Sequence, residues 1–145
     1  MTVRFKKHSD LATVPTYGTA CAAGADLYAA TDKDTVIPPH ETVMIPLGFS
    51  IEIPDGYCGL IFARSGIASK RGLAPANKVG VVDSDYRGEC MVALHNHSEK
   101  PQTVAPKERI AQLVITPFLH VDFEESDDLS STDRGAGGFG STGSH

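Results

Sequence analysis

The sequence predicts an all-β fold, a jelly-roll-like barrel or sandwich of short strands with one short helix. Short apolar segments rich in β-branched residues recur along the chain, and turns containing proline or glycine separate them. Closely spaced short strands of this kind are typical of sandwiches and barrels. No stretch of ordinary helix length carries apolar residues at helical spacing. Only segment 64–72 breaks the β pattern, and its length allows a helix of about two turns.

The strand predictions depend on β-branched and aromatic residues between turn signals. Apolar and polar residues alternate over 49–53, which predicts a strand with one buried face and places Ser50 and Glu52 on its polar face. Segment 57–63 is more continuously apolar and predicts a strand covered on both sides. In chain order, the predicted strands cover residues 3–6, 36–37, 42–46, 49–53, 57–63, 79–82, 90–94, 102–104 and 111–118.

A run rich in ionisable residues, 83–89, joins two of these predicted strands. Aspartate and serine at its start are typical of turns, so we expect a β-hairpin there. Its tip would carry Asp83, Asp85, Tyr86 and Arg87. By itself this segment is equally compatible with a solvated turn that needs aspartate and glycine only for its backbone shape.

Composition limits the classes of function. A chain of 145 residues has the usual size of one domain. The formal net charge of −5 provides no broad basic surface, so tight sequence-independent binding to a nucleic-acid backbone is disfavoured. A local group of arginines can still hold a small anion. Because the chain offers no broad basic surface, we expect no nucleic-acid partner.

The cysteines indicate a reducing compartment. Cys21, Cys58 and Cys90 are odd in number and lack metal-like spacing, which argues against a disulfide framework and against a zinc site. The first residues form no apolar signal segment, and no stretch approaches the ~18 apolar residues that span a bilayer. We expect a cytoplasmic protein, or a nuclear one in a eukaryotic cell, without a membrane partner.

The composition changes at residue 124, which predicts two parts: a β domain over 1–123 and a flexible arm over 124–145. The first half of the arm is acidic and polar and lacks core-forming residues, as expected of a mobile tether. The second half places glycines around Phe139, with Arg134 before it and hydroxyl residues after it. Glycine backbone can wrap an anion and an aromatic face can stack on a ring. A simple flexible tail is the alternative.

Other candidate residues have two interpretations each. Asp26 lies among small residues and is either a turn aspartate or a site residue. Arg64 and Ser65 begin the predicted helix, where they form an ordinary cap or a seat for phosphate. Gln112 is a lone polar residue in an apolar run and needs a hydrogen-bond partner, from the backbone or from a ligand.

Five segments, in order, resemble the five motifs of the homotrimeric deoxyuridine triphosphatases (dUTPases), all-β enzymes that convert dUTP and water to dUMP and pyrophosphate. Five ordered motifs across nearly the whole chain make this a specific resemblance. The segments are Ala23-Gly24-Ala25-Asp26-Leu27, Ala63-Arg64-Ser65-Gly66, Gly80-Val81-Val82-Asp83-Ser84-Asp85-Tyr86-Arg87-Gly88, Arg109-Ile110-Ala111-Gln112-Leu113 and residues 134–143.

The resemblance implies a role for each residue around the predicted hairpin. Asp83 would activate the water that attacks the α-phosphorus, a role suited to a carboxylate general base. Tyr86 would pack under the deoxyribose and leave no space for a 2′-hydroxyl. Asn77 and the backbone of Gly80 and Val82 would pair with uracil, and the narrow hairpin would exclude the methyl group of thymine.

The resemblance also assigns the phosphate chain. Asp26 would lie near the phosphates and the metal. Mg²⁺ would be held by triphosphate oxygens and waters, without a direct protein ligand, and would neutralise charge. The phosphates would be bound by residues of the second and fourth motifs, and the arm would close over the nucleotide with Phe139 on uracil. These residues are Arg64, Ser65, Gly66, Gln112, Arg134, Phe139, Gly140, Ser141 and Thr142.

The family architecture implies a homotrimer in which each site takes the first, second and fourth motifs from one chain, the hairpin from a second and the arm from a third. One departure is Lys107, where the family usually has glycine. Lysine adopts a positive φ less readily, so we expect a changed turn there. Two alternatives to dUTP hydrolysis are a dCTP deaminase of the same fold and a nucleotide-gated regulatory binding protein.

Overall fold

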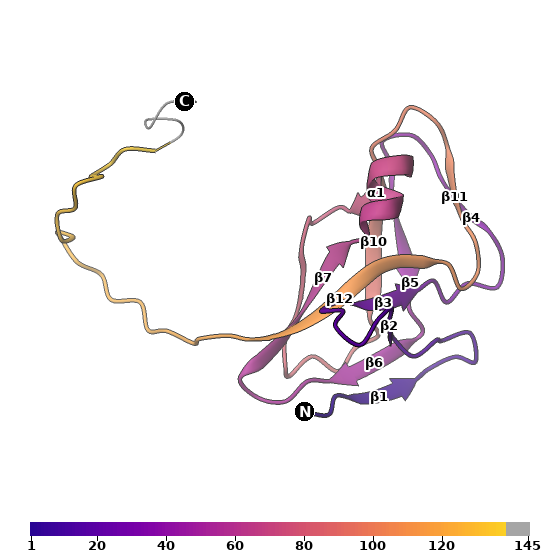
Figure 1. The fold of residues 1–145 in the computed structure, drawn as a ribbon, viewed down its shortest axis with the longest axis horizontal. Coiled ribbons are helices and arrows are strands. Elements are labelled where there is room, and N and C mark those ends of the chain that lie inside the picture. The colour runs from indigo at the N-terminus through magenta and orange to yellow at the C-terminus, as the bar shows by residue number, and fades with distance from the viewer. Residues whose placement is uncertain (139–145) are drawn as a thin grey trace.

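The computed structural model describes residues 1–138 and has an all-β architecture with one short helix, α1 (Figure 1). The β pattern that the sequence predicts is therefore confirmed, and so is the single helix. Three short strands, β2, β3 and β8, were not predicted. The elements are β1 (Arg4–Lys7), β2 (Thr16–Tyr17), β3 (Ala25–Tyr28), β4 (Thr35–Ile37), β5 (Thr42–Pro46), β6 (Phe49–Glu52), β7 (Tyr57–Ala63), α1 (Ser65–Arg71), β8 (Leu73–Pro75), β9 (Gly80–Val82), β10 (Met91–Asn96), β11 (Gln102–Val104) and β12 (Arg109–Pro117).

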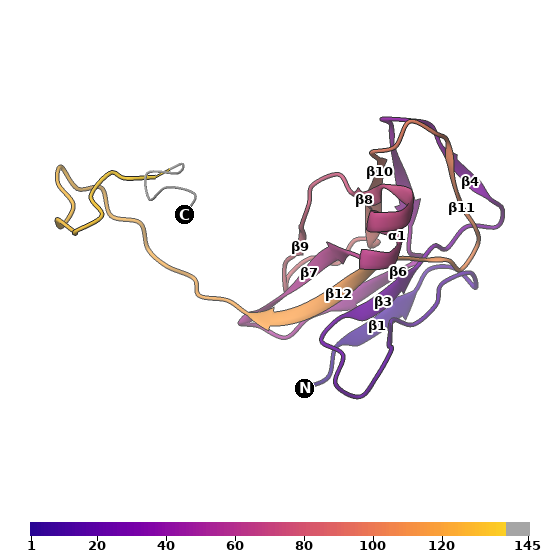
Figure 2. The ribbon, with the colours of Figure 1, turned by 45° about the horizontal axis from the view of Figure 1, so that its top comes forward.

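The strands of residues 1–138 form four separate sheets and no closed barrel, which decides between the two predicted architectures. The largest has the order β2-β3-β12-β7-β9, and the others are β5-β10-β8, β1-β6 and β11-β4. Figure 2 shows how these sheets lie around one interior. In the largest sheet β12 lies between β3 and β7, and its Gln112 is in register with Asp26 on one side and Phe62 on the other. This register brings the first, second and fourth motifs to one place.

The core takes side chains from all four sheets. Leu27, Ile45, Phe49 and Ile61 belong to one buried apolar cluster with residues of β4, β10, β11 and β12. The polar residue Asn96 is fully buried with them. It is accommodated because its amide group donates to backbone oxygens of residues 37, 38 and 100, at 3.0, 3.1 and 2.8 Å.

The helix α1 follows directly from β7. Arg64 before it has an extended backbone, with φ −88° and ψ 129°. Gly72 ends the helix in the left-handed conformation at φ 67°, and its N–H donates to the carbonyls of Ala68 and Ile67. Ile67 is the buried residue of the helix. This arrangement fixes Arg64 at the junction between a sheet and a helix.

The predicted hairpin at 83–89 is wrong in its pairing. β9 pairs with β7 in the largest sheet, whereas β10 pairs with β5 and β8 in another. The segment between them is therefore a connection that crosses from one sheet to another. The prediction failed because short-range turn signals specify a reversal of the chain but not the neighbour of each strand.

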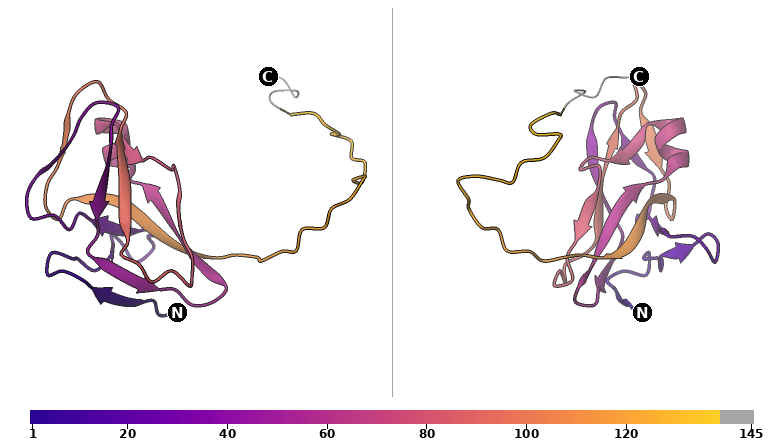
Figure 3. Two further views of the ribbon diagram at one scale, coloured as in Figure 1. Left: turned by 180° about the vertical axis from the view of Figure 1, so that it is seen from behind. Right: turned by 60° about the vertical axis from the view of Figure 1, so that its left-hand side comes forward.

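After β12 the chain leaves the body as an extended segment without helix or strand up to residue 138 (Figures 1 and 3). Its only secondary features are local turns, such as the bond from Gly137 N–H to the Arg134 carbonyl at 3.0 Å. The body that it leaves contains the residues of the first four motifs. Among residues 1–138 no helix has the length and apolar character needed to cross a membrane.

Candidate functional site

A cavity of about 400 Å³ gathers residues of the first, second and fourth motifs. They reach it from β3, from the junction of β7 with α1 and from β12. We call it the Asp26 cavity. Its lining residues are Gly18, Ala22, Gly24, Asp26, Arg64, Ser65, Gly66, Arg109 and Gln112.

The charges of this cavity are paired around one carboxylate. Asp26 Oδ1 accepts from Arg64 Nε at 2.6 Å, and its Oδ2 accepts from Arg109 Nη1 at 3.1 Å. The Asp26 side chain is only 13% exposed, whereas those of Arg64 and Arg109 are 24% and 52% exposed. The carboxylate therefore orients two guanidinium groups and leaves a net positive charge facing the cavity.

Gln112 is held in this cavity by a hydrogen bond to the backbone, and the lack of a side chain at Gly24 leaves room for its amide. Its Nε2 donates to the carbonyl of Ala63 at 2.9 Å. A Cβ atom at Gly24 would lie 2.7 Å from Gln112 Oε1, so only glycine leaves room for the amide. Of the two interpretations of Gln112, a backbone partner is thus found, and the side chain also faces the cavity.

A second cavity, of about 290 Å³, lies beside the connection from β9 to β10. We call it the Asp83 cavity. It is lined by the residues predicted to bind uracil, to pack under the sugar and to activate water. Apolar side chains of β9 and β10 also line it. Its lining residues are Met44, Ile61, Asn77, Gly80, Val81, Val82, Asp83, Tyr86, Glu89, Cys90 and Met91.

Asp83 differs from Asp26 in having no ionic partner among the described residues. It is exposed and follows β9 directly. Within residues 1–138 its carboxylate makes no ion pair and no side-chain hydrogen bond, while its backbone carbonyl accepts from the N–H of Tyr86 at 3.2 Å. A free carboxylate can accept a proton from water.

Tyr86 folds back over the connection that carries it. Its hydroxyl donates to the carbonyl of Glu89 at 3.0 Å. A Cβ atom at Gly88 would lie 2.3 Å from the Tyr86 hydroxyl oxygen, so glycine is required beneath the ring. Tyr86 is nevertheless 46% exposed, and it lines the Asp83 cavity.

Comparison with known proteins identifies the family. The sequence profile of the dUTPase family matches residues 10–143, which is most of the chain. The chain belongs to the dUTPase family. A deoxyuridine 5'-triphosphate nucleotidohydrolase of Desulfitobacterium hafniense is 51% identical over 131 residues, 90% of this chain and 87% of that protein. One of Pseudomonas paraeruginosa is 47% identical over 133 residues, 91% of this chain and 88% of that protein.

Solved structures agree with this assignment. A dUTPase of Staphylococcus bacteriophage 80alpha, determined with dUpNHpp, superposes with a TM-score of 0.90 at 28% sequence identity. The superposition covers 98% of each chain. The jelly-roll fold of the dUTPase family is therefore the fold of this chain.

Each site residue predicted for the β domain lines one of the two cavities. Asp26, Arg64, Ser65, Gly66 and Gln112 line the Asp26 cavity, and Asn77, Gly80, Val82, Asp83 and Tyr86 line the Asp83 cavity. The two cavities share no lining residue. No residue of the described part of the arm, 124–138, lines either cavity, and Arg134 Nε donates to the Gly137 carbonyl at 2.8 Å. Phe139, Gly140, Ser141 and Thr142 lie outside the described residues.

Arg109 is the site residue that the sequence predictions missed. It stands first in the fourth motif, yet no role was assigned to it from the sequence. Its contact with Asp26 spans 83 positions of the chain. Arg109 and Gln112 are three positions apart, a spacing that places two residues of a regular strand on opposite faces. The register shift between Arg109 and Ala111 brings both to the same cavity.

The predicted change in the turn at Lys107 is not found. Lys107 adopts φ 61°, the left-handed conformation that glycine adopts at little cost. Its N–H donates to the Ala29 carbonyl at 2.9 Å, and the Ala29 N–H donates to the Glu108 carbonyl at 2.9 Å. These two bonds hold the turn in a glycine-like shape despite the lysine side chain.

A metal has no ready-made cage in this part of the chain. Among residues 1–138 no group of three or more His, Cys, Asp or Glu side chains could hold an ion. Each oxygen of Asp26 already accepts from an arginine. Burial raises the pKa of the Cys90 thiol, on the Asp83 cavity, to about 11, so this thiol is protonated at neutral pH.

Proposed function

We propose that this protein hydrolyses dUTP to dUMP and pyrophosphate, with Asp83 as the general base. The observation that carries the proposal is the Asp83 carboxylate, unpaired within residues 1–138, in the lining of a cavity that Asn77 and Tyr86 also line. Asp83 takes a proton from water while the water oxygen bonds to the α-phosphorus. The bond from the α-phosphorus to the oxygen that bridges to the β-phosphate breaks, and pyrophosphate leaves with that oxygen.

In this proposal the Asp83 cavity selects the nucleoside. Uracil pairs with backbone groups of Gly80 and Val82 and with the amide of Asn77. The ring of Tyr86 packs under the deoxyribose, so a 2′-hydroxyl would collide with it. The support is that these residues line one cavity with Asp83.

The Asp26 cavity would hold the phosphate chain. Arg64 and Arg109 are already oriented by Asp26, so little freedom is lost when they bind phosphate oxygens. The Ser65 hydroxyl and the Gln112 amide supply further polar contacts. Mg²⁺ would enter with the triphosphate as part of the substrate and neutralise its charge, since both Asp26 oxygens are occupied.

Three copies would be needed to build a site. Both cavities lie on one chain without sharing a residue, which supports a site made where the Asp26 cavity of one copy meets the Asp83 cavity of another. The arm of a third copy, with Arg134, Phe139, Gly140, Ser141 and Thr142, would close over the nucleotide. We further propose a cytoplasmic location, which suits the free cysteines Cys21, Cys58 and Cys90.

The test is incubation with dUTP and with dCTP in ¹⁸O-labelled water, with products separated by chromatography and weighed by mass spectrometry. The proposal predicts dUMP that carries ¹⁸O, unlabelled pyrophosphate and no uracil nucleotide from dCTP. Label in pyrophosphate would place the attack on the β-phosphorus. Deamination of dCTP would make the protein a deaminase of the same fold.

A second candidate function is nucleotide-gated partner binding. The phage dUTPase that superposes on this chain is described as controlling transfer of virulence genes by a G protein-like mechanism. A pull-down with and without dUpNHpp tests it here. Partner capture that depends on the nucleotide and persists in an Asp83→Asn variant would make binding the primary function.

A further inference from the structure

A buried hydroxyl lies beneath the connection that carries Tyr86. Ser50 is on β6, on the face predicted to be polar, and it is only 5% exposed because the connection from β9 to β10 covers it. The Ser50 hydroxyl donates to the carbonyls of Gly88 and Arg87, at 2.7 and 3.0 Å. Beside these bonds, the Cys90 N–H donates to the carbonyl of Phe49, the β6 residue before Ser50, at 2.7 Å.

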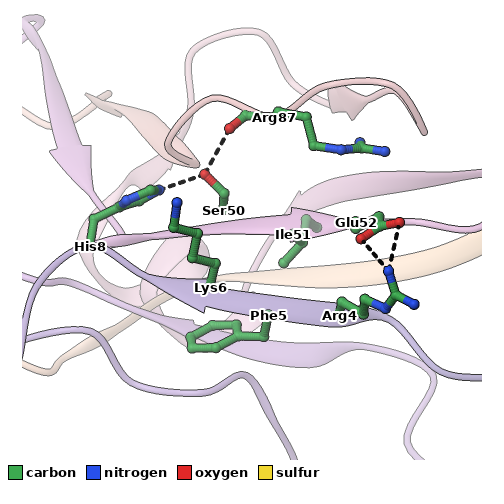
Figure 4. Close-up of a pocket in the computed structure, with 8 residues that line it drawn as sticks. All are labelled: Arg4, Phe5, Lys6, His8, Ser50, Ile51, Glu52 and Arg87. Carbon is green, nitrogen blue, oxygen red and sulfur yellow. Dashed lines mark hydrogen bonds and ion pairs between the residues drawn. The ribbon is translucent and has the colours of Figure 1, made fainter.

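His8 completes this arrangement from the end of β1. Its Nε2 lies 2.6 Å from the Ser50 hydroxyl oxygen, beside a cavity of about 370 Å³ (Figure 4). A hydroxyl has one proton, and that of Ser50 is shared between two carbonyls, so Nε2 carries a proton and His8 is the donor. The backbone N–H of His8 donates to the Gly48 carbonyl at 2.8 Å, and this bond fixes the position of the His8 backbone.

The peptides that Ser50 holds are the ones on which Tyr86 rests. The Tyr86 ring lies against Gly88, where no Cβ would fit, and its hydroxyl bonds to the carbonyl of Glu89. A shift of this backbone would therefore move the ring. Glu89 is itself attached to the β6 side, since its Oε1 accepts from the Gly48 N–H at 3.1 Å.

We propose that His8 and Ser50 are positioning residues that fix the backbone under Tyr86 and thereby set the discrimination between deoxyribose and ribose. The inference depends on the proposed function, in which Tyr86 is the sugar-selecting residue. Without the Ser50 hydroxyl, the carbonyls of Arg87 and Gly88 lose their buried donor and this backbone can move away from β6. Tyr86 would then tolerate a 2′-hydroxyl.

Cys90 provides a readout that does not depend on catalysis. It is 4% exposed and follows the held peptides. Burial raises the pKa of its thiol to about 11, so with the segment in place the thiol stays protonated and unreactive at about pH 8. Opening of this segment should therefore speed alkylation of Cys90, which lines the Asp83 cavity but is almost fully buried.

The experiment compares Ser50→Ala, His8→Leu and His8→Gln with the unaltered protein, at a temperature well below unfolding. Glutamine keeps an N–H donor of similar reach, and leucine does not. Two quantities are measured: the iodoacetamide alkylation rate of Cys90, located by mass spectrometry, and the ratio of kcat/KM for dUTP to that for UTP. Ser98→Ala is the matched control, because it removes a hydroxyl with local hydrogen bonds near Gly72, at the end of α1.

We expect Ser50→Ala and His8→Leu to lower the dUTP-to-UTP ratio by about three- to tenfold and to speed Cys90 alkylation by a similar factor. His8→Gln and Ser98→Ala should match the unaltered protein in both. Faster alkylation with an unchanged ratio would overturn the positioning role, and so would no change in either. If the unaltered protein failed to hydrolyse dUTP, the proposed function would fail, while alkylation would still show whether His8 and Ser50 hold the segment.

Discussion

The Asp26 cavity and the Asp83 cavity use the same side chain, aspartate, in opposite ways. Asp26 is largely buried and has both oxygens bonded to arginines, at 2.6 and 3.1 Å. Asp83 is exposed, and its carboxylate has no ionic partner within residues 1–138. A carboxylate engaged by two cations organises those cations for binding, whereas an unengaged one can take a proton. In the proposed mechanism, this contrast separates binding of the phosphates from chemistry on them.

The largest expected effect concerns Asp83. Asp83→Asn should lower kcat for dUTP by about 100- to 10,000-fold, because the amide cannot accept the proton of the attacking water. Affinity for dUpNHpp, measured by calorimetry, should change little. A variant with unaltered turnover would remove Asp83 from the role of base and end the contrast between the cavities.

Deletion of the arm should have the second-largest effect. Deletion of residues 134–145 should leave thermal unfolding unchanged, because the body ends its last strand at Pro117. It should lower kcat/KM for dUTP by about a hundredfold, since neither cavity alone closes over the nucleotide. Full activity of the truncated protein would show that the cavities suffice without it.

Asp26→Asn should raise KM for dUTP by about tenfold or more, because two arginines lose a charge-assisted partner worth about 1.5–3 kcal/mol per bond. The control is Glu52→Gln, which removes the exposed partner of Arg4 at 3.2 Å and should leave steady-state kinetics unchanged. An effect on kcat with KM unaltered would instead place Asp26 in the chemical step.

The smallest effect concerns the turn before Arg109. Lys107→Gly should raise the free energy of unfolding by about 0.5–1 kcal/mol, because relief of the strain at φ 61° exceeds the added flexibility of the unfolded chain. Lys107→Ala keeps the strained conformation and should give no gain in a denaturant titration. A fall in dUTP turnover in the glycine variant would mean that the lysine side chain contributes to the Asp26 cavity.

Much of the fold was predictable because it depends on local patterns. Alternating apolar residues at 49–53 and the turn signals around them predicted β6 within one residue of its observed end at Glu52. Very short strands such as β2, with only two residues, carry too little pattern to detect. Pairing was less predictable: the hairpin failed because β9 and β10 each have better-placed neighbours in different sheets.

The same limit applies to the site. Asp26, Arg64 and Gln112 could be named from the motifs, and the register of β12 with β3 and β7 accounts for their meeting in one cavity. Arg109 could not be assigned, since its partner lies 83 positions away. The burial of Ser50 was also unpredictable, because the segment that covers it belongs to another part of the chain.

The sequence by itself determined the β class, the single helix, the family and the residue types that the chemistry requires, because turn residues, β-branched segments and five ordered motifs are local properties of the chain. Tertiary structure alone decided which charges are paired and which carboxylate is left free. It also decided that the connection from β9 to β10 lies on Ser50 and His8. These outcomes depend on contacts between residues far apart in the chain, which only the register and packing of the sheets bring together.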